Sequence, residues 1–153
     1  MSDISEIFDV VDATWPAAEK IPAGSLTLRR GAGGGKRVSA ATANGPVLPE
    51  EVDVAELRMR EMGQVPLFSL RPWDEALDAL LAARGYGVAD VTNVLICPID
   101  RIADVEIDRE QAGMPVWEPL AIQLDMWAEG GIGRDRLAVM EREQCNKTTL
   151  IGR

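Results

Sequence analysis

The chain of 153 residues contains no histidine. This absence excludes His-dependent catalytic triads, HExxH zinc sites and every imidazole general base. Any chemistry has to come from carboxylates, from Tyr86 as the single tyrosine, from a cysteine or from the backbone. On this basis the catalytic residues are unknown and no metal ligand is assigned.

Cysteines and long apolar runs are also scarce. Cys97 and Cys145 lie far apart and lack the spacing of metal ligands, so we expect reduced thiols rather than a disulfide framework. No apolar stretch approaches the roughly 18 residues of a membrane span. The N-terminus "MSDISEIFDV" is acidic where a signal peptide is basic. The sequence therefore predicts a cytoplasmic protein with no membrane partner.

Basic residues are outnumbered by acidic ones, 16 to 25, and the formal net charge is −9. Phosphate backbones are bound by clustered lysines and arginines, so a general nucleic-acid binder is not expected. The cations that do cluster are Lys20, Arg29, Arg30, Lys36 and Arg37. This local group could still hold a small anion. The content of 46% hydrophobic and 27% charged residues is typical of a globular chain, as one domain or two small interdependent halves.

The run "RRGAGGGKRVSAATANG", residues 29 to 45, raises the question of a phosphate-binding loop. A nucleotide P-loop requires Gly, four residues, then Gly-Lys-Ser/Thr. Gly35 and Lys36 fit the middle of that pattern, but Arg37 replaces the hydroxyl residue and Arg30 replaces the first glycine. The sequence does not support a nucleotide site here.

We interpret Leu26 to Arg30 and Arg37 to Ala43 as two strands of a hairpin with a glycine-rich connection, because small and β-branched residues follow the glycines. A mobile hairpin tip is the favoured interpretation of that connection. An anion site made of free backbone amides beside two cations is the alternative.

Apolar periodicity predicts further elements along the chain. Helices are expected at residues 2–15, 48–63, 71–85, 117–131 and 133–143, and strands at 65–70, 88–99, 104–107 and 147–153. The inward positions expected on these helices include Val52, Ala55, Met59, Leu77, Leu81, Leu120, Leu124 and Trp127. This pattern predicts an α/β (mixed α+β) fold in which helices cover a mixed sheet.

Three segments resemble a known family: "GGGKRVSAATA", "LFSLRPWDEALDALLAARGYGVAD" and "WEPLAIQLDMWAEGGIGRDRLAVMEREQCNKTTLIGR". They resemble the N-terminal portion of a bacterial GNAT-type N-acetyltransferase that has two GNAT-like halves. The resemblance implies a degenerate half at residues 1–100, a connection at 101–115 and the start of a second half at 116–153. That second half would open with a strand, two helices and a further strand.

The resemblance implies acetyl-CoA as cofactor and a small-molecule amine or a protein N-terminus as acceptor. The family binds the cofactor's pyrophosphate on an Arg/Gln-x-x-Gly-x-Gly/Ala turn between a strand and a helix. "RRGAGG" differs in spacing and precedes an expected strand, and "GGIGR" lies between two expected helices. No cofactor-binding residue is therefore assigned, and we expect a shortened family member that is inactive alone. The alternative is a non-enzymatic GNAT-like binding or dimerisation module.

By position, the resemblance implies that the acceptor cleft is bordered by Trp117, Trp127, Glu129, Gly130, Gly131 and Ile132. The alternative is that both tryptophans belong to a core and the two glycines end a helix. The final "TTLIGR" would leave an unpaired strand edge, which predicts a possible homodimer through that strand.

Overall fold

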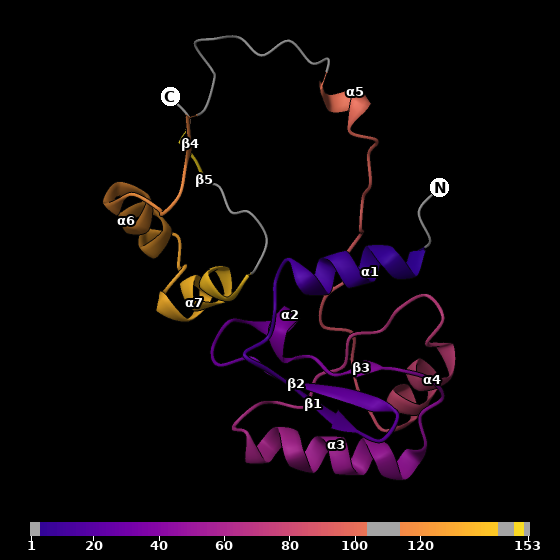
Figure 1. The fold of residues 1–153 in the computed structure, drawn as a ribbon. Helices are drawn as coiled ribbons and strands as arrows, with labels where there is room; N and C mark the ends of the chain where they lie inside the picture. Colours follow the sequence, from indigo (N-terminus) through magenta and orange to yellow (C-terminus); the bar gives the residue numbers. More distant parts are fainter. Residues whose placement is uncertain (1–3, 104–113, 144–148, 152–153) are drawn as a thin grey trace. The chain divides into compact units, whose positions relative to one another are not determined.

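The structure is a computed structural model that describes residues 4–103, 114–143 and 149–151. The chain divides into two compact units, coloured along the sequence in Figure 1. Unit 1 comprises residues 1–86 and 131–145, and unit 2 comprises residues 87–130 and 146–153. The GNAT-like halves expected from the resemblance stay a prediction, since this division concerns only contacts within the chain.

Unit 1 contains a small antiparallel sheet with helices before and after it. Its elements are α1 (Ile4–Ala13), β1 (Glu19–Ala23), β2 (Leu26–Arg30), α2 (Lys36–Ser39), β3 (Thr42–Ala43), α3 (Pro49–Glu61), α4 (Glu75–Ala83) and α7 (Arg134–Arg142). The strand order is β1-β2-β3, and each neighbouring pair is antiparallel. An isolated parallel bridge joins Ala41 to Phe68. The predicted mixed α/β class is confirmed at this level.

The turn between β1 and β2 is fastened to the start of α3. Gly24 has a φ of 61°, and a Cβ there would overlap the carboxylate of Glu51. That carboxylate accepts the backbone N–H of Ser25 at 2.7 Å and of Leu48 at 2.8 Å. Glu51 thereby satisfies one of the free N–H groups that a helix start leaves and joins α3 to the sheet.

The core of unit 1 lies between the sheet and helices α3 and α4. Helix α3 packs against β1 and β2, as Figure 1 shows. The buried side chains are Leu26 and Leu28 from β2, Val52, Ala55 and Met59 from α3, and Leu77 and Leu81 from α4. The inward positions predicted for α3 and α4 are therefore confirmed.

The second strand of the predicted hairpin is largely wrong. Residues 36–39 form the short helix α2, and only Thr42 and Ala43 pair with β2. Gly35, at φ 101°, lets the chain turn into a helix that is closed by a hydrogen bond from Ala40 N to Lys36 O at 3.0 Å. Because α2 buries Val38 completely, tertiary packing outweighs the β-branched character of this segment.

The strands predicted at 65–70 and 88–99 are also wrong. The first contributes only the bridge at Phe68. The second contains no strand, and its apolar side chains are exposed, with Val91 at 87% and Leu95 at 89%. A β-prone sequence needs a strand edge to pair with, and no described strand pairs with residues 88–99.

Unit 2 contains α5 (Asp100–Ala103), β4 (Met114–Val116), α6 (Ala121–Glu129) and β5 (Thr149–Ile151). Strands β4 and β5 pair antiparallel, with Val116 opposite Thr149. The C-terminal strand is thus confirmed, and it pairs with the preceding strand β4. The homodimer through this strand stays a prediction. The strand predicted at 104–107 lies outside the described residues.

The two later helices were predicted from their sequence, and both are present. The predicted inward face of α6 is wrong, however, because Leu120 and Leu124 are exposed and Gln123 is the buried residue. In the charged helix α7, Val139 is fully buried. Among the helices that the structure describes, none is long and apolar enough to cross a membrane.

Candidate functional site

The six residues predicted to border the acceptor cleft are divided between the units. Trp117, Trp127, Glu129 and Gly130 belong to unit 2, and Gly131 and Ile132 belong to unit 1. Trp117 is exposed and Trp127 half-buried. Gly130 caps the C-terminus of α6, donating its N–H to Met126 O at 3.1 Å, and Gly131 follows at φ 80°. The alternative is confirmed for the two glycines, which end a helix, and is wrong for Trp117, which is exposed rather than part of a core. The acceptor cleft stays a prediction.

The glycine-rich run corrects the sequence argument in two respects. Residues 30–35 are Arg-Gly-Ala-Gly-Gly-Gly, so the Arg-x-x-Gly-x-Gly spacing is present one residue later than the "RRGAGG" frame. The run also connects a strand, β2, to a helix, α2, rather than two strands. Both sequence-based reasons for excluding it as a pyrophosphate loop were therefore wrong. Whether the loop can bind a pyrophosphate depends on its geometry in the structure.

That geometry shows a loop packed against its own chain. Gly31 N donates to the Gln64 side chain at 2.8 Å, and Gly34 N donates to Gly31 O at 2.9 Å. Gly31 and Gly34 are buried, and a Cβ on Gly34 would lie 2.5 Å from Cγ2 of Val139 in α7. The interpretation of the loop as a hairpin tip is wrong, because part of it is enclosed by α7 and Gln64.

The loop does not fit the pyrophosphate of acetyl-CoA. Two of its amides already donate within the protein, and the carboxylate of Asp135 in α7 lies against Gly33. A carboxylate at this position repels a phosphate. The following helix has only four residues, which is too short to supply a substantial helix dipole.

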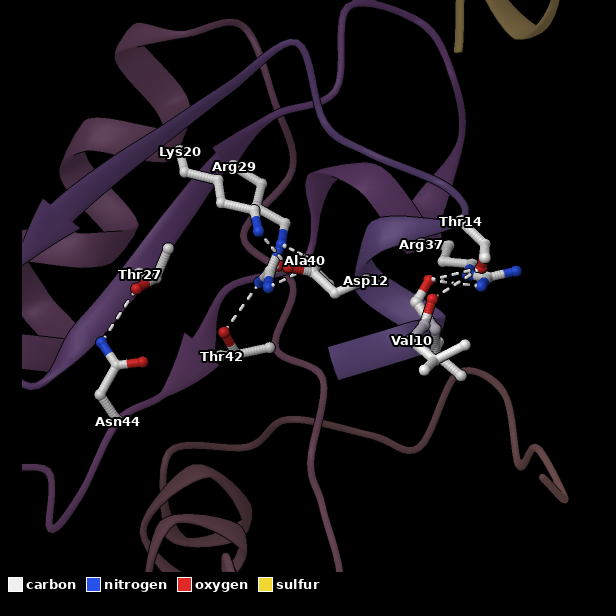
Figure 2. Close-up of polar contacts among 11 residues, drawn as sticks. Val10, Asp12, Thr14, Lys20, Thr27, Arg29, Arg37, Ala40, Thr42 and Asn44 are labelled. Carbon is white, nitrogen blue, oxygen red and sulfur yellow. Dashed lines mark hydrogen bonds and ion pairs between the residues drawn. The ribbon is translucent and has the colours of Figure 1, made fainter. Parts of the chain in front are cut away.

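A different site lies beside α1, where basic side chains line a small hollow of about 60 Å³. Figure 2 shows part of its polar network. The hollow is lined by Phe8, Val11, Asp12, Trp15, Arg29, Arg37, Ala40, Thr42, Ser69 and Arg71. All of them belong to unit 1.

Arg29 forms the buried floor of this network. Its guanidinium donates to Thr42 Oγ1 at 2.8 Å and Ala40 O at 3.1 Å, and to Asp12 Oδ1 from Nη2 at 3.0 Å (Figure 2). Asp12 is also paired with Lys20. Burial alone would raise the pKa of the Asp12 carboxyl, but the hydrogen bond from Lys20 and the charge of Arg29 outweigh it and lower that pKa.

The other two arginines of the hollow are less engaged. Arg37 donates from Nη2 to Val11 O at 2.7 Å and so satisfies a carbonyl near the C-terminus of α1. Arg71 stacks against two aromatic rings, with Cζ 5.6 Å from the Phe8 centroid and 5.9 Å from the Trp73 centroid. No acceptor for the Arg71 guanidinium is found in the described part of the chain.

Sequence reasoning found part of this site. Arg29 and Arg37 belong to the predicted basic group, whereas Lys20 and Arg30 form ion pairs with Asp12 and Glu19. Arg71 was not predicted as a residue of this site, because it follows the segment 65–70, which was wrongly predicted to be a strand. The parallel bridge between Ala41 and Phe68 brings it to the hollow, and a lone arginine in the sequence carries no signal for such a contact.

Tyr86 closes a second polar cluster, between α3 and the end of α4. Its hydroxyl donates to Glu56 Oε1 at 3.0 Å, and its ring meets Phe68 edge-on at 5.5 Å between centroids. Burial of the phenol, together with the hydrogen bond and negative charge of Glu56, raises the pKa of Tyr86 to about 12. A phenol with so high a pKa is a poor proton donor at neutral pH, and the contacts of Tyr86 indicate a structural role.

No group of three or more acidic, cysteine or histidine side chains in the described ranges is placed to hold a metal ion. No model of a protein family, no curated protein and no solved structure matches the chain.

Proposed function

We propose that the protein is a member of the GNAT-type N-acetyltransferase family, whose enzymes transfer an acetyl group from acetyl-CoA to a primary amine, and that this chain is inactive alone. One observation carries the proposal. Residues 114–151 run strand, helix, helix, strand, and the two strands β4 and β5 pair antiparallel. The resemblance implies this order for the opening of a GNAT half. The mixed α/β character of unit 1 supports the same assignment.

On this proposal the residues present serve the acceptor side rather than the cofactor. The glycine-rich loop does not fit a pyrophosphate, so no step of the transfer is assigned to it. Glu129, the last residue of α6, supplies an exposed carboxylate, whereas Trp127 lies two positions earlier and projects in a different direction. A carboxylate such as that of Glu129 binds a primary ammonium group by charge-assisted hydrogen bonds.

An NMR titration with primary amines and a peptide with a free N-terminus tests the acceptor side. We expect saturable chemical-shift changes at the Glu129 backbone N–H with the amines and the free peptide. We expect none with the N-acetylated peptide, because it lacks the charge. Glu129→Gln should weaken binding, whereas Asp125→Asn, an exposed acid on the same helix, should not. Equal responses to the free and acetylated peptides, or no saturable response, would contradict the proposal.

A parallel titration with acetyl-CoA tests the assignment of the cofactor. We expect only weak binding that fades above about 0.1–0.2 M salt, where exposed charges are screened, and no thiol release with any amine. Saturable binding that resists salt, accompanied by turnover, would show that these residues do form a cofactor site.

The exposed segment 88–99 favours a second candidate, a non-enzymatic binding or dimerisation module. Val88, Val91, Leu95 and Ile99 are each more than three-quarters exposed. Sedimentation velocity over a range of concentrations tests it. Association that Leu95→Asp abolishes would favour the module, and a monomer at all concentrations would count against it.

A further inference from the structure

The hollow beside α1 is small, and separate parts of unit 1 contribute both apolar and charged side chains to it. Its side chains come from α1, β2, α2, β3 and the segment before α4. The volume of about 60 Å³ has room for roughly four to six water molecules, since one water molecule occupies about 10–15 Å³ of such a cavity. An inorganic phosphate, with five heavy atoms, is of that size.

The charge of the lining is positive although the chain as a whole is acidic. The lining contains three arginines, Arg29, Arg37 and Arg71, and one carboxylate, Asp12, which leaves a surplus of two positive charges. Asp12 is already compensated by Arg29 and Lys20, so its charge does not cancel the other two arginines. A dianion would neutralise the hollow.

Hydrogen-bonding capacity is left over on the same two arginines. Arg37 uses one N–H for the Val11 carbonyl, and Arg71 makes no hydrogen bond from its guanidinium to any residue that the structure describes. Stacking on Phe8 and Trp73 restricts the Arg71 side chain, so less conformational entropy is lost when it binds an anion. Ser69 adds a hydroxyl to the lining.

A purely structural role accounts for two of the three arginines. Arg29 ties α1 to β3, and Arg37 satisfies a carbonyl of α1. It does not account for the unused donors of Arg71. We propose that the hollow binds a small dianionic oxyanion of the phosphate type, held by Arg37 and Arg71 above the buried Arg29. This inference does not depend on the acetyltransferase proposal.

The test is a calorimetric titration with inorganic phosphate at constant ionic strength, with sulfate and acetate as further probes. Sodium chloride compensates for the added ions, so that screening is the same throughout. We expect saturable binding of phosphate and sulfate, and acetate at least tenfold weaker because it carries one charge. Equal binding of acetate would overturn the assignment to a dianion, and no saturable phosphate binding would overturn the site.

Arg71→Gln is the decisive variant, because Arg71 makes no hydrogen bond that the fold would lose. We expect its phosphate affinity to fall at least tenfold, with an unchanged circular dichroism spectrum. Arg58→Gln, a charge change on α3 outside the hollow, should leave the affinity unchanged. Arg37→Gln should weaken binding too, but it also removes the contact to α1. Equal loss of affinity in Arg58→Gln and Arg71→Gln would show that only the net charge matters and would overturn the proposal.

Discussion

Helix α3 in unit 1 and the segment 88–99 in unit 2 both contain large apolar side chains, yet these side chains end in opposite environments. Val52 and Met59 on α3 are fully buried, whereas Val91 and Leu95 are almost fully exposed. A helix satisfies its backbone within itself and needs only a surface on which to lay one face. A strand needs a second strand for every hydrogen bond. A segment of high β-propensity therefore becomes a strand only where the folded protein offers another strand edge with which its backbone can form hydrogen bonds.

The largest expected effect comes from the same substitution in the two environments. Leu28→Ala removes a fully buried side chain from β2 and should lower the free energy of unfolding by about 2–5 kcal/mol. Leu95→Ala in the exposed segment should change it by less than about 0.5 kcal/mol. Urea unfolding followed by circular dichroism measures both. A comparable loss of stability in the two variants would mean that residues 88–99 are packed in solution. It would contradict the difference in burial between β2 and this segment.

The second prediction concerns the packing of α7 on unit 1. Gly34→Ala places a Cβ against Val139 and Val38, and we expect a loss of about 1–3 kcal/mol in the free energy of unfolding. Gly45→Ala is the matched control, since nothing lies within 4 Å of a Cβ there. If both variants unfold at the same urea concentration, α7 does not cover the glycine-rich loop.

A third prediction separates buried from exposed ion pairs within unit 1. Asp12→Asn leaves the Arg29 guanidinium, only 6% exposed, without its counter-charge, and should cost about 1–3 kcal/mol. Glu19→Gln, whose partner Arg30 is 46% exposed, should cost less than about 1 kcal/mol.

The contribution of Asp12 to the free energy of unfolding should change with pH in a definite direction. The pKa of Asp12 is lower in the folded protein than its ordinary 3.8, so the contribution of Asp12 is present above pH 3.8 and is lost as the pH falls through the folded pKa. The difference between the wild type and Asp12→Asn should therefore shrink in acid. A difference that persists unchanged at low pH would show that the charge of Asp12 is not its cause.

The smallest effect is expected at Tyr86, the last residue of unit 1 before the exposed segment. Because this is the single tyrosine, ultraviolet absorbance of tyrosinate reports on it alone. The midpoint should lie at about pH 12 in the folded protein and near 10 in urea. Since the folded pKa is the higher one, the stability that Tyr86 contributes is complete below pH 10 and is lost between pH 10 and 12. A folded midpoint near 10 would place Tyr86 in solvent and outside unit 1.

Local patterns predicted the helices well. The spacing of Val52, Ala55 and Met59, with Pro49 before them and Gly63 after them, was enough for α3, and the same reasoning located α1, α4, α6 and α7. Strand β2 and the C-terminal strand also followed from their residues. The strands expected at 65–70 and 88–99 and the second hairpin strand did not, because pairing partners and the packing of Val38 are non-local.

The sequence by itself determined the amphipathic helices, the absence of imidazole chemistry and the local cluster of cations, since each depends on residue type and near-neighbour spacing. Only the tertiary structure decided which of those cations meet. The crossing that brings Ala41 beside Phe68 adds Arg71 to Arg29 and Arg37, and ion pairing draws Lys20 and Arg30 to their own carboxylates. A hollow depends on residues far apart in the chain, so its charge and its free donors exist only once the sheet and α1 have packed together.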